Sequence, residues 1–149
     1  TAISSTAIRR AVAYGDLDTA GQMLGRRYDL FVRVVPGSAR GRSIGIPTIN
    51  LSIAKEKLLP PDGVYAVRVH AALGSFGGMM NLGGRPTFGG AERVPEVHMF
   101  GASGDWYGAE VAVEFVSRIR DTVRFSGVEA LVQQLGRDAD AAQIALTQA

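Results

Sequence analysis

The chain has 149 residues, of which 46% are hydrophobic and 20% are charged, and it contains no cysteine. This length is typical of one domain that buries its own core, and this composition excludes the disordered and fibrous classes. The lack of cysteine excludes a disulfide scaffold and thiolate metal sites, and it is consistent with a reducing cytoplasm. The formal net charge is +2, and 14 of the 16 basic residues are arginine, whose forked side chain suits phosphate.

The charge pattern and the hydropathy argue against two classes of partner. No run of basic residues interleaved with aromatic residues is present, so we expect no nucleic-acid partner. No uninterrupted apolar stretch approaches the roughly 20 residues of a membrane-spanning helix, and Thr1 to Arg10 lacks the layout of a signal peptide. We therefore expect a cytoplasmic protein without a membrane partner.

The first 26 residues predict a short helical arm. Ser4 and Ser5 are suited to cap a first helix, which Gly15 ends. Asp16 starts a second helix, whose apolar residues keep helical spacing until Gly25. This arm is too small to be a domain of its own.

From Tyr28 to about Arg120 the apolar residues recur with period two, which is typical of strands. Three runs show this most clearly and place on one face Val32 and Val34, then Tyr65, Val67 and Val69, then Val111, Val113 and Phe115. Glycine-rich turns separate the runs, and no helical pattern intervenes. Such a series predicts an antiparallel sheet that closes into a barrel and so hides its edges.

The last segment predicts one long helix that packs across the barrel. Its apolar residues form a stripe at helical spacing, made of Val128, Leu131, Val132, Leu135, Ala139, Ala142 and Leu146. Ser126 and Glu129 have the spacing of a capping box at its start. The expected fold class is thus mainly β, with a barrel between a short N-terminal helical arm and a long C-terminal helix.

The stretch from Gly37 to Asn50 combines glycines with two arginines, a composition that suits a phosphate cradle. Glycines let backbone N–H groups approach oxyanions closely, and Arg40 and Arg42 supply charge. Thr48 and Asn50 are two residues apart, so on a strand a hydroxyl and an amide oxygen share a face and can reach one hard cation. The alternative is a solvated hairpin loop followed by a turn, and the ending of a Walker A loop is missing.

A second segment predicts a strand that carries Glu96 and His98 on one face and Val97 and Met99 on the other. We expect the carboxylate to face into the barrel, as a general base for a hydroxyl during phosphoryl transfer, with the barrel wall limiting water. The alternative is a solvent-facing glutamate. For His98 a structural role is favoured, because two histidines in the chain offer no metal-ligand spacing.

Three further places in the chain carry polar or aromatic groups with two interpretations each. Asn81 opens a stretch through Phe88 that suits either a ring ligand or a plain turn. Residues 105–108 are typical of a hairpin tip, with an aromatic lid as the alternative. For Arg120 the chemistry alone favours a surface ion pair with Asp121 or a neighbour.

Eight short motifs follow one another along the chain: GRSIGIPTIN at 41–50, PDGVY at 61–65, NLGGRPTF at 81–88, EVH at 96–98, YG at 107–108, VEF at 113–115, RIRD at 118–121 and VEAL at 128–131. In this order they resemble riboflavin kinase, specifically the C-terminal kinase module of the bifunctional bacterial riboflavin kinase/FAD synthetase. The resemblance runs nearly end to end, and its specificity lies in the order of the motifs.

This resemblance implies a six-stranded antiparallel, Greek-key-like barrel and an ATP-dependent phosphorylation of riboflavin at its ribityl 5′-hydroxyl, which gives FMN and ADP. It implies that Thr48 and Asn50 hold Mg²⁺ and the phosphates of ATP, and that Glu96 is the base. The loop that closes over the nucleotide would contribute Gly37, Arg40, Gly41, Arg42, Gly45 and Pro47. Riboflavin would lie between the barrel mouth and the start of the last helix, with Asn81, Arg120 and Ser126 as candidates for the flavin side.

Residues 3–9, ISSTAIR, resemble the motif that ends the adenylyltransferase module preceding the kinase in the bifunctional enzymes. This implies that residues 1–26 are a remnant of that module, that 27–149 form the kinase domain, and that an FAD-synthetase module precedes it in the full-length protein. The nucleotide signature of that module is absent here, so we expect no FAD synthesis from this chain. The alternative function is a non-catalytic flavin- or nucleotide-binding barrel. This sequence differs from the usual family pattern at seven positions: Val32, Pro36, Ile49, Gly101, Ala102, Ser126 and Gly127.

Overall fold

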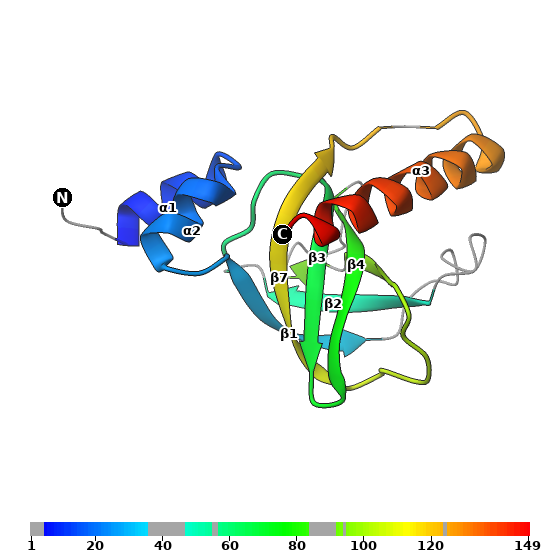
Figure 1. The fold of residues 1–149 in the computed structure, drawn as a ribbon, viewed down its shortest axis with the longest axis horizontal. Coiled ribbons are helices and arrows are strands. Elements are labelled where there is room, and N and C mark those ends of the chain that lie inside the picture. Colours follow the sequence, from blue (N-terminus) through cyan, green and yellow to red (C-terminus); the bar gives the residue numbers. More distant parts are fainter. Residues whose placement is uncertain (1–4, 36–46, 55–56, 84–91, 94, 124) are drawn as a thin grey trace.

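The computed structural model describes residues 5–35, 47–54, 57–83, 92–93, 95–123 and 125–149. Two short helices at the N-terminus lie beside a β-barrel, and one long helix at the C-terminus crosses the outside of it (Figure 1). Within these residues there is no helix that is both long and apolar enough to cross a bilayer.

The N-terminal arm consists of α1 (Ser5–Ala13) and α2 (Leu17–Leu24), as predicted. Asp16 caps α2, because its carboxylate accepts a hydrogen bond from the backbone N–H of Thr19 at 3.2 Å. Gly25 ends α2 in the left-handed region with φ 77°, a conformation that glycine adopts without steric cost. The two helices bury a small apolar cluster of their own, made of Ala11, Val12 and Ala20.

Six strands form a closed antiparallel barrel, as predicted: β1 (Asp29–Val35), β2 (Thr48–Ala54), β3 (Gly63–Ala71), β4 (Gly74–Leu82), β6 (Glu96–Met99) and β7 (Glu110–Arg120). They pair in the order β1-β7-β3-β4-β6-β2, and β2 pairs again with β1, which closes the sheet. The two-residue strand β5 (Glu92–Arg93) pairs with the end of β2. Closure removes the exposed sheet edges that would otherwise pair with another chain.

Alternation along the strands gives the barrel an apolar interior and a mixed outer face. The inward-facing side chains pack as one core, which includes Val32, Leu51, Tyr65, Met80, Val97, Val113 and Phe115, each at most 7% exposed. The rings of Tyr65 and Phe115 meet edge to face, with centroids 5.3 Å apart. The inward residues predicted from the three alternating runs are therefore all confirmed as core residues.

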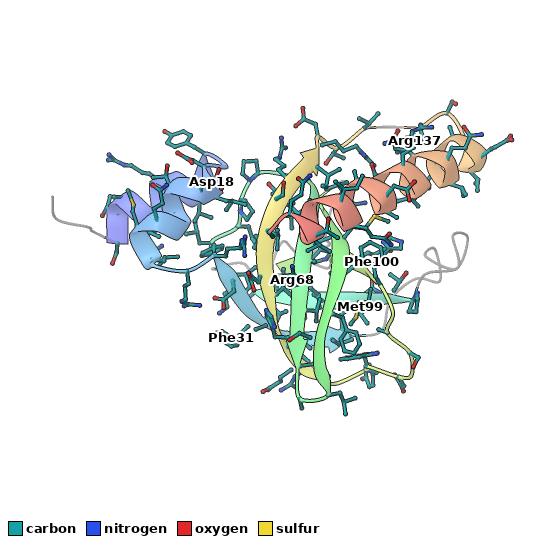
Figure 2. All side chains as sticks on the ribbon, in the orientation of Figure 1. Asp18, Phe31, Arg68, Met99, Phe100 and Arg137 are labelled. Carbon is teal, nitrogen blue, oxygen red and sulfur yellow. The ribbon has the colours of Figure 1, made fainter. Side chains whose placement is uncertain are left out.

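The long helix α3 (Val128–Thr147) covers part of the outer face of the barrel (Figure 1). Its buried side chains pack against three outward-facing residues of β3 and β4, namely Val64, Ala66 and Met79. Near the C-terminal end of the helix, Nη2 of Arg68 on β3 donates a hydrogen bond to the carbonyl of Leu146 at 2.8 Å (Figure 2). The helix thus creates a second apolar layer outside the barrel.

The start of α3 differs from the prediction. Gly127 is the N-cap, its backbone is extended, and no side chain caps the helix. Ser126 therefore lies one residue too early for its hydroxyl to cap the first turn, and the predicted capping box does not form. Val128, which was expected in the apolar stripe, is 73% exposed, so the buried stripe begins later in the helix.

Glu114 on β7 links the outer face of the sheet to the connection that follows the arm. Its two carboxylate oxygens contact Nε2 of His70 at 2.8 Å and Nη1 of Arg27 at 3.3 Å. Burial alone raises the pKa of Glu114, but hydrogen bonds and charge from His70 and Arg27 outweigh burial, so that its pKa is lowered overall. The ionised carboxylate is therefore the form that stabilises the fold.

We expect the stabilisation from Glu114 to depend on pH. Because the folded-state pKa is lowered, this contribution is fully present above the ordinary glutamate pKa of about 4.3 and is lost as pH falls through the lower folded pKa. Denaturant unfolding of Glu114→Gln should show a loss of up to about 1 kcal/mol at neutral pH that shrinks on acidification. Glu110→Gln, an exposed glutamate on the same strand, is the control, and a loss that stays constant down to about pH 3 would contradict the prediction.

Two glycines with opposite surroundings give a second prediction. A Cβ at Gly78 would lie 2.8 Å from the backbone oxygen of His98, whereas a Cβ at Gly136 would meet nothing within 4 Å. Gly78→Ala should therefore destabilise by about 1–3 kcal/mol, because β4 and β6 cannot both keep their places. Gly136→Ala should stabilise by about 0.5–1 kcal/mol, because alanine favours the interior of a helix. Thermal unfolding of both variants tests this, and equal effects would contradict it.

Candidate functional site

Glu96 on β6 lies between two amide side chains on neighbouring strands. It is the Cα partner of Asn50 on β2 and of Asn81 on β4. Directly paired residues present their side chains on one face of a sheet, so these three residues form a polar row across β2, β6 and β4. Thr48 lies on the same face, opposite His98.

The backbone hydrogen bonds show how closely these side chains approach one another. The N–H of Leu51 bonds to the carbonyl of Pro95 at 3.0 Å, and the N–H of Met99 bonds to the carbonyl of Pro47 at 2.8 Å. These bonds flank the pairs Asn50–Glu96 and Thr48–His98, which are therefore non-hydrogen-bonded pairs. In such pairs the Cα atoms are about 4.5 Å apart and the side chains are closest. The side chains of Thr48, Asn50, Glu96 and His98 thus lie close together, and we call these four residues the Glu96 block.

The block faces outward, which corrects the prediction that Glu96 points into the barrel. The interior positions of β6 are taken by Val97 and Met99, both 0% exposed. Since side chains alternate along a strand, Glu96 and His98 lie on the outer face, which α3 covers further along the sheet. Glu96 is partly buried there, so neighbouring elements on this outer face, rather than the barrel interior, limit its access to water.

His98 is nearly as buried as the core residues, with 3% of its surface exposed. Its Nε2 has no hydrogen-bond partner among the described residues. Burial lowers the pKa of His98, and the nearby carboxylates of Glu96 and Asp138 offset this only in part. His98 is therefore neutral at physiological pH, which agrees with the structural role that the sequence favoured.

The side chains of Thr48 and Asn50 suit a hard cation. Asn50 is only 6% exposed and lies on the same outward face as Thr48. An amide oxygen beside a hydroxyl is a suitable donor set for Mg²⁺. Among all the residues that the structure describes, no group of three or more His, Asp or Glu side chains is placed to hold a metal ion.

Arg120, a candidate for the flavin side, forms a partly buried ion pair instead of the surface pair that its chemistry alone favoured. Its Nη2 lies 2.7 Å from Oδ2 of Asp138, and its Nε donates to the same carboxylate at 2.9 Å. Its Nη1 donates to the backbone carbonyl of Asp121. The partner Asp138 was not predicted, although its place on the same helical face as Leu135 and Ala142 was a sign that a carboxylate would be buried there.

The remaining candidate residues are either exposed or outside the described residues. Asn81 and Ser126 are exposed, Asn81 at the end of β4 and Ser126 just before α3. Pro47 is exposed and precedes β2 directly. The predicted nucleotide loop residues Gly37, Arg40, Gly41, Arg42 and Gly45 lie outside the described residues, as do residues 84–88 of the stretch that begins at Asn81.

The sequence matches the Flavokinase family, described as riboflavin kinase, over residues 24–146. This chain belongs to the riboflavin kinase family. Among its relatives, the bifunctional riboflavin kinase/FMN adenylyltransferase of Haemophilus influenzae is 42% identical over 142 residues, which cover 95% of this chain and 46% of the relative. The protein of the same description from Bacillus subtilis is 37% identical over 141 residues, covering 91% of this chain and 44% of the relative.

A solved structure with the same fold shows a similar level of identity. It is described as a macrolide-efflux protein from Streptococcus pneumoniae, and it superposes with a TM-score of 0.83 at 39% identity. The match covers 95% of this chain and 46% of that one. This riboflavin kinase family member thus spans just under half the length of the proteins that it matches.

Proposed function

We propose that this chain transfers the γ-phosphate of ATP to the ribityl 5′-hydroxyl of riboflavin, giving FMN and ADP. The observation that carries the proposal is the outward-facing block in which Glu96 lies beside Asn50 and near Thr48. A carboxylate next to a hydroxyl and an amide supplies a proton acceptor and oxygen ligands for a cation on one face. Membership of the riboflavin kinase family supports the identity of the two substrates.

In the proposed reaction, Glu96 accepts the proton of the 5′-hydroxyl while the hydroxyl oxygen bonds to the γ-phosphorus. The bond between that phosphorus and the bridging oxygen of the β-phosphate breaks, and ADP leaves. The protein contributes mainly position and charge, because phosphoryl transfer needs little covalent chemistry from the enzyme.

Thr48 and Asn50 would hold a magnesium ion, because a hydroxyl and an amide oxygen on one strand face are oxygen donors that suit a hard cation. A bound divalent cation neutralises charge on the phosphates of ATP. The loop residues Gly37, Arg40, Gly41, Arg42 and Gly45, with Pro47, complete the proposed nucleotide side, and Asn81 and Ser126 the flavin side. Arg120, the third candidate for the flavin side, is held by hydrogen bonds from each of its three nitrogens to Asp138 or to the backbone of Asp121.

We further propose that residues 27–149 form the kinase domain and that 1–26 are the remnant of a preceding FAD-synthetase module. The coverage of the bifunctional relatives, 46% and 44%, is consistent with an attached module, and the family match begins at residue 24. FAD synthesis is then not a property of this chain. A cytoplasmic location is consistent with the absence of cysteine.

Formation of FMN tests the proposed function. Protein incubated with riboflavin, ATP and Mg²⁺ should give FMN that is separable by chromatography. Glu96→Gln should lower kcat by about 10²–10⁴, because the amide cannot accept the proton, and it should leave the KM for ATP nearly unchanged. Glu110→Gln, which alters an exposed glutamate elsewhere on the barrel, should behave as wild type.

Two outcomes would count against this proposal. If Glu96→Gln keeps near-normal turnover, Glu96 is not the base. If the wild-type protein binds riboflavin, as read by quenching of its fluorescence, but releases no FMN, the non-catalytic binding barrel is the better description. The family match does not favour that alternative.

Thr48→Ala should act on the metal–nucleotide complex. Loss of the hydroxyl removes one proposed oxygen ligand while Glu96 stays in place, so the KM for Mg-ATP and the Mg²⁺ concentration at half-maximal rate should both rise. Steady-state rates over a Mg²⁺ titration measure both quantities. Ser52→Ala is the matched control, because Ser52 lies four residues further along β2 and also carries a hydroxyl. A fall in kcat with no shift in Mg²⁺ dependence would place Thr48 outside the cation site.

A further inference from the structure

Asp138 is a charged side chain buried in the middle of α3. Only 1% of its surface is exposed. Its carboxylate accepts hydrogen bonds from Nε and Nη2 of Arg120, at 2.9 Å and 2.7 Å, and from Nε2 of Gln134 at 2.8 Å. A buried carboxylate is costly without hydrogen-bond donors, and this set of donors connects the helix to the end of β7.

Arg120 belongs to the same row of residues as Glu96. Crossing the strands, Asn81 pairs with Val64 on β3, and Val64 pairs with Arg120 on β7. The row of paired residues that contains Glu96 and Asn81 therefore continues across the apolar Val64 to Arg120. Asp138 thus attaches α3 to one end of a row whose other end is the Glu96 block.

The helix covers one part of this row and leaves the other part open. Val64 is buried beneath α3, whereas Glu96 is only partly buried and Asn81 is exposed. Asp138 also lies close enough to His98, two residues from Glu96, for its charge to act on that side chain. The place where the helix stops covering the sheet therefore determines how much of the Glu96 face a substrate can reach.

We propose that Asp138 is a positioning residue for the acceptor side of the site. By holding Arg120, it fixes the edge of α3 relative to Glu96 and Asn81 and so sets the opening through which the hydroxyl substrate reaches the carboxylate. This inference rests on the proposed kinase function for its substrate. Thr48 and Asn50 belong to β2, which β6 separates from the strands β3 and β4 that α3 covers, so we expect no change on the nucleotide side.

The test compares Asp138→Asn with Asp140→Asn, the same change at an exposed position of the same helix. Asp138→Asn should raise the KM for riboflavin and lower kcat/KM for riboflavin by roughly ten- to a hundredfold, with the KM for Mg-ATP within about twofold of wild type. Asp140→Asn should match wild type. A purely structural role would lower the fraction of active protein without separating the two KM values, and that result would overturn the proposal.

A double variant separates positioning from direct contact with the substrate. Arg120→Met combined with Asp138→Leu replaces the ion pair by apolar side chains that can still dock the helix. If Asp138 and Arg120 act by placing α3, the KM for riboflavin in the double variant should lie much closer to the wild-type value than it does in Asp138→Asn. A defect that persists in a double variant with wild-type circular dichroism would mean that Arg120 touches the substrate itself and would overturn the proposal.

Amide hydrogen exchange of the protein without ligands tests the inference even if no FMN forms. In Asp138→Asn the amides of α3 and of the β6 segment 96–99 should exchange faster than in wild type and in Asp140→Asn, while those of β1 keep their rates. Unchanged exchange at β6 would overturn the proposal. Absence of FMN from the wild-type protein would overturn only the proposed function, because this measurement does not depend on turnover.

Discussion

The antiparallel register between β6 and its two neighbours is the constraint on which the candidate site depends. Side chains alternate along a strand, so a slip of one residue would turn Glu96 into the barrel and Val97 out of it. Burial opposes such a slip, because Val97 and Met99 are fully covered in the core. The packing of apolar residues inside the barrel thereby determines which polar residues meet outside it.

The outer face combines exposed and buried polar groups in a graded way. His98 and Asp138 are buried, Glu96 is partly buried and Asn81 is exposed. The charges that are buried are compensated, since Asp138 is paired with Arg120, whereas His98 is neutral because burial lowers its pKa. A buried ion pair is weak evidence for stability, because desolvation offsets much of the attraction. What this pair does provide is a direct connection between α3 and the end of β7.

Membership of the riboflavin kinase family and the local geometry support different parts of the functional proposal. The family match over residues 24–146 points to the substrates, and the strand register points to the atoms that could act on them. The matched region is less than half the length of these relatives. The small arm formed by α1 and α2 buries its own apolar cluster and carries none of the site residues.

The sequence by itself determined the helical arm, the inward residues of the long strands, the barrel and the pairing of Glu96 with His98 on one strand face. These features follow from local periodicity and from glycine or aspartate at helix ends, which neighbouring residues decide. The tertiary structure alone decided that Glu96 faces outward, that Asn50 and Asn81 flank it, and that Arg120 meets Asp138. Periodicity separates the two faces of a strand, but only the packing of distant strands and α3 decides which face is enclosed and which residues become partners.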